Sequence, residues 1–173
     1  VRANDRILTY AKRISNPSAS LPSPSPLAGF RTVENIYEIM QLSRRQPRSK
    51  ILATYYEKLT HIFWVSQNHL FHSYASYKYF VLCRDHNKSM TESTLTTLAT
   101  NVLLSAMCIP SGRVGKKGDI DNTAEEDQRK EKDQRMANLL GFSSDPTREA
   151  LLMELENKGI IGLCTEESRE LYK

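Results

Sequence analysis

Cysteine is scarce in this 173-residue chain, and no run of hydrophobic residues is long enough to cross a membrane. The three cysteines, Cys83, Cys108 and Cys164, form neither a close pair nor a cluster with metal-ligand spacing. An odd number of scattered thiols suits a reducing compartment, where cysteine acts as a small apolar side chain. No apolar stretch approaches the ~20 residues of a membrane-spanning helix, and no signal-peptide pattern opens the chain. We therefore expect a soluble cytoplasmic protein that binds no membrane.

The sequence also lacks a complete nucleotide-binding motif. Residues 112–118 (GRVGKKG) superficially resemble a phosphate-binding loop. A P-loop has four residues between its glycines, a Ser or Thr after the lysine, and a strand before it. Here two residues separate Gly112 from Gly115, Lys117 replaces the hydroxyl, and a helix is predicted upstream. We interpret the segment as a surface loop, with incidental phosphate contact as the second interpretation.

Two pairs of side chains have the helical spacing of metal ligands, but neither pair has further ligands nearby. His69 and His72 share one helical face, and positions 65, 66, 73 and 76 carry no carboxylate or thiol. Cys83 and His86 lie one turn apart near a helix end, and a metal site would need two more ligands. We interpret both pairs as structural and expect no metal, no cofactor and no catalytic residue. The rival hypothesis is a hydrolase or a metal-dependent enzyme that uses His69, His72 or Cys83.

Apolar side chains recur at helical spacing along most of the chain, whereas no stretch alternates as a strand does. The expected helices cover residues 27–42, 49–65, 69–85, 89–109, 123–140, 146–159 and 166–172. Asn68 and Asp145 are the expected N-caps of two of them, and Ser89 and Thr123 begin capping boxes. Gly141 and Gly159 are expected to end helices, and residues 160–163 to form a packed turn. The fold class is therefore all-α, with antiparallel helical pairs.

The first 28 residues differ from the rest of the chain. Residues 2–14 form a predicted basic helix, and residues 15–26 contain four prolines, which is typical of a linker. We divide the chain into residues 1–28, a short basic helix plus a Pro/Ser-rich linker, and residues 29–173, a helical-repeat domain. The apolar fraction of 39% is below the ~45–50% of a self-contained domain, which favours a segment of a larger assembly. Because the chain begins at Val1, we expect a piece of a longer protein.

Positive charge is concentrated toward the N-terminus. The net charge is +4 overall, but +6 over residues 1–60 and −3 over residues 111–173. Arg44, Arg45, Arg48 and Lys50 lie in one proline-containing loop and are the best candidates for RNA or ribosome contact. Lys and Arg that neutralise phosphates bind nucleic acid without reading its sequence. A solvated loop without a partner is the equally plausible alternative.

Aromatic residues are concentrated in two adjacent predicted helices, between positions 55 and 80. Burial of one aromatic side chain contributes on the order of 1.5–3 kcal/mol, so most of them are expected to pack between helices. Trp64 and Tyr79 lie off the apolar faces. Since aromatic residues are enriched at interface hot spots, these two are the candidates for contact with a protein partner.

A long ordered series of segments resembles the largest component of eukaryotic translation initiation factor three, its a subunit, over about residues 30–173. The longest segment is residues 52–64 (LATYYEKLTHIFW), and the predicted closing element is residues 166–172. The others are VENIY at 33–37, LFH at 70–72, NKSMT at 87–91, LLSAMCIP at 103–110 and RMANLLGF at 135–142. Residues 111–124 depart from the family's pattern, and residues 1–28 are not covered.

The resemblance implies a right-handed helical-repeat part of a PCI domain, with the family's winged-helix subdomain expected beyond these 173 residues. It implies a non-catalytic scaffold that helps to assemble the preinitiation complex and recruit mRNA. The implied partners are other components of the factor, especially the PCI-containing c subunit, and the small ribosomal subunit with its rRNA and proteins. A PCI scaffold of the proteasome lid or the COP9 signalosome is the alternative.

Overall fold

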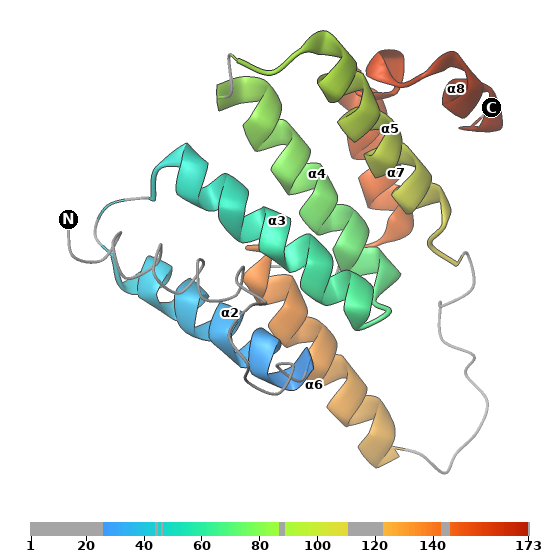
Figure 1. Ribbon diagram of the computed structural model, residues 1–173. Helices are drawn as coiled ribbons and strands as arrows, with labels where there is room; N and C mark the ends of the chain where they lie inside the picture. The colour runs from blue at the N-terminus through green and yellow to red at the C-terminus, as the bar shows by residue number, and fades with distance from the viewer. Residues whose placement is uncertain are drawn as a thin grey trace, which may run out of the picture.

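The computed structural model (Figure 1) describes residues 26–43, 45, 47–86, 89–110, 123–142 and 146–172. Every regular element in these ranges is helical, which confirms the predicted all-α class. The elements are α2 (Pro26–Leu42), α3 (Ser49–Val65), α4 (His69–His86), α5 (Glu92–Met107), α6 (Thr123–Leu139), α7 (Arg148–Asn157), η1 (Ile161–Leu163) and α8 (Glu166–Tyr172). The predicted helix over residues 2–14, residues 15–25 of the linker after it and the loop over residues 111–122 lie outside the described residues, and Pro26, the last residue of that linker, begins α2.

Helices α3, α4 and α5 lie side by side, and each runs antiparallel to its neighbour (Figure 1). The α3–α4 pair makes the most extensive contact in the described structure. On one side of this row, α2 packs against α3 and contacts α6. On the other side, α7, η1 and α8 contact α5. This succession of antiparallel neighbours is the arrangement of a helical-repeat protein.

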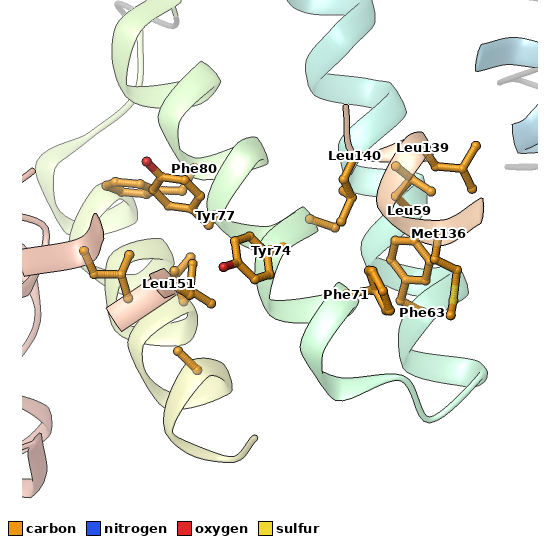
Figure 2. Packing of buried hydrophobic residues seen from close by; sticks show 14 of the residues in the cluster. Leu59, Phe63, Phe71, Tyr74, Tyr77, Phe80, Met136, Leu139, Leu140 and Leu151 are labelled. Carbon is orange, nitrogen blue, oxygen red and sulfur yellow. The ribbon is translucent and has the colours of Figure 1, made fainter. Parts of the chain in front are cut away.

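The core is centred on the facing sides of α3 and α4. Leu59 and Phe63 of α3 and Phe80 of α4 are fully buried, and the Phe63 and Phe71 ring centroids lie 5.7 Å apart (Figure 2). Phe63 follows Leu59 by four residues, so both side chains lie on one helical face. The predicted apolar stripes therefore do form the interior of the described structure.

Buried tyrosines connect this pair to helices that are distant in the sequence. The Tyr55 hydroxyl donates a hydrogen bond of 3.0 Å to the carbonyl of Leu139 at the end of α6. The Tyr74 hydroxyl donates to the Thr147 carbonyl at 2.8 Å, and the Tyr77 hydroxyl donates to Glu154 Oε1 at 2.7 Å. Since a buried hydroxyl without a partner is costly, these bonds fix α6 and α7 in register with α3 and α4.

Helix α6 is attached to the fold through its C-terminal turn. Met136, Ala137 and Leu139 are buried, whereas the described side chains between positions 127 and 135 are exposed. The N-terminal part of α6 projects past the other helices in Figure 1. One ion pair, with 2.7 Å between Arg135 Nη2 and Glu34 Oε1, links α6 to α2.

Two predicted N-caps are wrong by two residues. The cap of α5 is Thr91 and not Ser89, because the Thr91 hydroxyl accepts a 3.4 Å hydrogen bond from the Thr94 amide. The cap of α7 is Thr147 and not Asp145, because Thr147 accepts a 3.1 Å bond from the Ala150 amide. In both cases a threonine nearer to the helix satisfies an amide of the first turn.

The prediction that Gly141 and Gly159 end helices is confirmed. Gly141 and Gly159 have φ values of 74° and 65°, the left-handed conformation that glycine adopts without a steric penalty. The amide after each glycine donates a hydrogen bond of 3.0 Å back to the helix, Phe142 to Ala137 and Ile160 to Leu155. This is the Schellman pattern of helix termination.

A pair of neighbouring aromatic residues tests the described core. We expect Phe63→Ala to lower the free energy of unfolding by about 3–5 kcal/mol, because it leaves a cavity between α3 and α4. Trp64→Ala should cost less than about 1 kcal/mol, because that side chain is largely exposed. Urea denaturation of both variants measures the difference, and equal losses would contradict the assigned faces of α3.

Candidate interaction surfaces

A groove with a volume of about 910 Å³ lies between α3, α4 and α5. Its α3 wall is formed by residues at positions i, i+3, i+4 and i+7, which share one helical face. The lining residues are Glu57, Thr60, His61, Trp64, His69, His72, Ser76, Tyr79, Leu98, Asn101, Val102, Leu104, Ser105 and Cys108. The volume is at the upper end of the ~300–1,000 Å³ typical of ligand sites.

Both aromatic residues that the sequence singled out lie in this groove. Trp64 is 58% exposed, and its ring centroid lies 5.2 Å from that of His72 and 6.2 Å from that of His69. Tyr79 is half-buried on the neighbouring helix, and burial, followed by a hydrogen bond to Cys83, raises its pKa to about 12. The structure thus brings Trp64 and Tyr79 onto one surface, and their contact with a partner remains a prediction.

Two hydroxyls on the groove walls are already used within the fold. The Thr60 hydroxyl donates to the Glu57 carbonyl at 2.7 Å, and the Ser105 hydroxyl donates to the Val102 carbonyl at 2.8 Å. The apolar part comes mainly from α5, where Leu98 is half-buried and Leu104 is 36% exposed. Hydroxyls that bond their own helix leave these apolar surfaces as the main feature of the groove.

His72 has a structural role in the groove wall. Its Nδ1 lies 2.9 Å from the Thr60 carbonyl oxygen, which assigns the proton to Nδ1 as the donor. Burial lowers the pKa of His72 below its ordinary value, and the neighbouring His69 and His61 lower it further. Within the described ranges, no group of three or more His, Cys, Asp or Glu side chains is arranged to hold a metal ion.

The second metal-like pair is divided between the interior and the surface. Cys83 is buried, whereas His86 is exposed at the end of α4. Burial raises the pKa of the Cys83 thiol, although a hydrogen bond from Tyr79 partly offsets this. A thiol with a raised pKa is a poor nucleophile and a poor metal ligand, because the thiolate is the reactive form.

The basic loop lies at the opposite end of α3. Arg45, Arg48 and Lys50 are exposed there, and Arg44 lies outside the described residues. Arg48 is the N-cap of α3, and no acidic residue occupies the first turn of that helix. Cations at a helix N-terminus oppose the helix dipole by ~0.3–1 kcal/mol each, so these residues do not serve to stabilise α3. Positive side chains and free amides together favour an anionic partner.

The basic loop and the groove occupy different parts of α3, and Trp64 is the α3 groove residue most distant from the loop. Trp64 follows Arg48 by 16 positions along α3, which corresponds to about 24 Å at ~1.5 Å per residue. Glu57, at the near end of the groove, follows Lys50 by seven positions, which corresponds to about 10 Å. Arg45, Arg48 and Lys50 are thus exposed before and within the first turn of α3, whereas Trp64 and Tyr79 both line the groove.

Sequence reasoning missed the part of the groove that α5 provides. Asn101, Leu104 and Cys108 are exposed in the groove, although only the inward face of α5 was predicted. One signal was available, because the run Val102, Leu103, Leu104 cannot place three consecutive side chains on one helical face. No local sequence pattern, however, indicates how far α5 is shifted along its axis relative to α3.

None of the described helices is both long enough and apolar enough to cross a membrane. Antiparallel helices around a buried aromatic core define a helical-repeat domain.

Comparison with known families identifies which helical-repeat domain this is. The family described as "eIF3a, PCI domain, TPR-like region" matches residues 28–173, and the chain belongs to this family. Its relatives include the A subunit of eukaryotic translation initiation factor 3 from Arabidopsis thaliana, which is 38% identical over 151 residues. The proteins of the same name from Coccidioides immitis and Nicotiana tabacum are 41% identical over 161 residues and 36% identical over 151 residues.

These matches cover 83% of this chain but 15% of the length of each relative. The resemblance inferred from the ordered segments is thereby confirmed.

The burial of His72 predicts a loss of stability in mild acid. Because its folded pKa is lowered from 6.5, the unfolded state binds the proton more tightly, and stability declines as the pH falls below 6.5 toward the folded pKa. His72→Gln should flatten this decline in urea titrations between about pH 7.5 and 5.5, whereas His86→Gln, an exposed control, should retain it. An unchanged pH dependence in His72→Gln would contradict the assignment.

Proposed function

We propose that this chain is part of a non-catalytic scaffold subunit of eukaryotic translation initiation factor three. In this role it helps to assemble the preinitiation complex on the small ribosomal subunit, in the cytoplasm, and to recruit mRNA. The observation that carries the proposal is membership of the eIF3a PCI and TPR-like family over residues 28–173. The names of the relatives favour this factor over the proteasome lid or the signalosome.

Protein partners are assigned to the groove. Trp64 and Tyr79 lie on two adjacent helices of a tightly packed pair, so their positions are fixed before a partner binds. A fixed aromatic side chain loses little conformational entropy on binding, which is why aromatic residues dominate interface energetics. The partners we propose are other subunits of the factor, especially the c subunit with its own PCI domain.

The ribosomal partner is assigned to the basic loop. Arg44, Arg45, Arg48 and Lys50 place four cations within seven positions of the sequence, next to the N-terminus of α3. An rRNA backbone, an mRNA or an acidic ribosomal protein would each provide the negative charge that this loop attracts. A scaffold needs such separate surfaces on one rigid frame, and it needs no catalytic group.

Sedimentation tests the proposal as a whole. The tagged full-length protein is crosslinked in its native cells, the lysate is run through a sucrose gradient, and each fraction is identified by mass spectrometry. We expect it to comigrate with small ribosomal subunits and other subunits of the factor. Comigration with proteasome or signalosome subunits, or with neither, would contradict the translation assignment.

Neutralising the basic loop tests its role separately. We expect the triple variant Arg45→Ala, Arg48→Ala, Lys50→Ala to bind purified small ribosomal subunits more weakly and with a shallower salt dependence. Three lost phosphate contacts would reduce the slope of log K against log salt by about 2 to 3. Binding is measured between about 50 and 200 mM salt, the range in which this electrostatic contribution changes strongly.

The matched control neutralises three exposed cations on other helices, Arg31, Lys130 and Lys132. The same loss of affinity in this control would show that net charge, and not the basic loop, determines binding.

A further inference from the structure

We infer that the groove between α3, α4 and α5 receives a segment of a partner protein that carries a bulky apolar side chain and, about 10 Å away, a lysine or arginine. The apolar side chain lies against Trp64 and Leu104, and the cation pairs with Glu57. This inference rests on the proposed function, because it takes the groove to be one of the scaffold's protein-binding surfaces.

The apolar end of the groove is defined by Trp64 and the exposed face of α5. Trp64 is 58% exposed, although its ring lies against His72 and His69, so one face is supported and the remainder is open. Leu104 and Cys108 line the same groove from α5 and are exposed. Covering these side chains removes apolar surface from water, which favours a bulky apolar side chain as the occupant.

The other end of the groove is negatively charged. Within the described lining, Glu57 is the one carboxylate, and no lysine or arginine accompanies it. Its charge contributes to the raised pKa of both Tyr79 and Cys83, which places the carboxylate beside α4. A complementary occupant therefore brings a cation to this end.

The spacing between the two ends follows from the helix. Glu57 and Trp64 are seven residues apart on α3, which is two turns and about 10 Å along one face. A partner meets this spacing with side chains at i and i+7 of a helix, which share one face. The exposed Asn101 lies in the same groove and offers both a donor and an acceptor to the partner's backbone.

The same charges disfavour a nucleic acid in the groove. An RNA strand brings one negative charge per nucleotide and needs lysine or arginine to neutralise it. The described lining offers Glu57 instead, and the cations of the basic loop are not among the lining residues. The groove and the basic loop are thus suited to occupants of opposite charge.

Site-specific crosslinking identifies the occupant. Leu104 is replaced by the photo-crosslinking residue p-benzoylphenylalanine in the tagged full-length protein, expressed in its native cells. After irradiation, the sedimenting complexes are digested and the crosslinked residue is located by mass spectrometry. We expect one helical protein segment, with an apolar residue at the crosslink and a lysine or arginine seven positions away.

Charge reversal provides the specific control. Glu57→Lys should lower the crosslink yield by about fivefold or more, because it places two cations at one end of the groove. Glu38→Lys, the same change at an exposed position on α2, should leave the yield within about twofold. Replacing the partner's own cation by glutamate should restore the yield in the Glu57→Lys protein.

Other outcomes overturn the inference. An RNA crosslink, a crosslink to a second copy of this chain, a segment without the cation, or no crosslink would each do so. The same gradients report on the proposed function. A protein that comigrates with small ribosomal subunits but fails the crosslinking test contradicts only this inference. A protein that does not comigrate with them contradicts the proposed function instead.

Discussion

Contact between the buried faces of α3 and α4 is the interaction on which the rest of the described structure depends. Leu59 and Phe63 from α3 meet Phe71 from α4, and none of these side chains reaches solvent to a significant extent. Each other described helix is positioned from this pair, either directly or through α5. Tyr55 holds the end of α6, and Tyr74 and Tyr77 hold α7 and the residue that caps it. A frame built in this way is rigid because close-packed side chains have no alternative arrangement of similar energy.

The same packing determines which surfaces remain open. Since one face of α3 is buried in the core, the opposite face presents Glu57, His61 and Trp64 to the groove. The basic residues lie before and within the first turn of α3, where they oppose the helix dipole and contribute nothing to the core. One helix thus carries an apolar, acidic groove near its C-terminus and a cationic loop at its N-terminus. We propose that the scaffold uses these two different surfaces of one helix to hold a protein partner and a ribosomal partner at the same time.

Much of the fold was predictable from the sequence, because helical periodicity is a local property. The stripes containing Val33, Leu59 and Phe71 indicated both the helices and their buried faces, and glycine indicated two of the helix ends. The N-caps were less predictable, because Thr91 and Thr147 compete with other capping residues two positions away. The turn after α3 contains Gln67 at a φ of 55°, a conformation that the sequence does not signal.

The groove was predictable only in part. Trp64 and Tyr79 could be recognised because they lie off the apolar stripes. The α5 residues in the groove could not, because their place there depends on how α5 is positioned relative to α3, with α4 between the two helices. Hydroxyl-radical footprinting of the full-length protein, free and assembled with its sister subunits, tests most directly whether the groove binds a partner. If it does, oxidation of Trp64 falls several-fold on assembly, while that of Met153, exposed on α7, serves as the internal reference. Unchanged oxidation of Trp64 in the assembled complex would contradict this role, because the groove would then be open to water when the scaffold is complete.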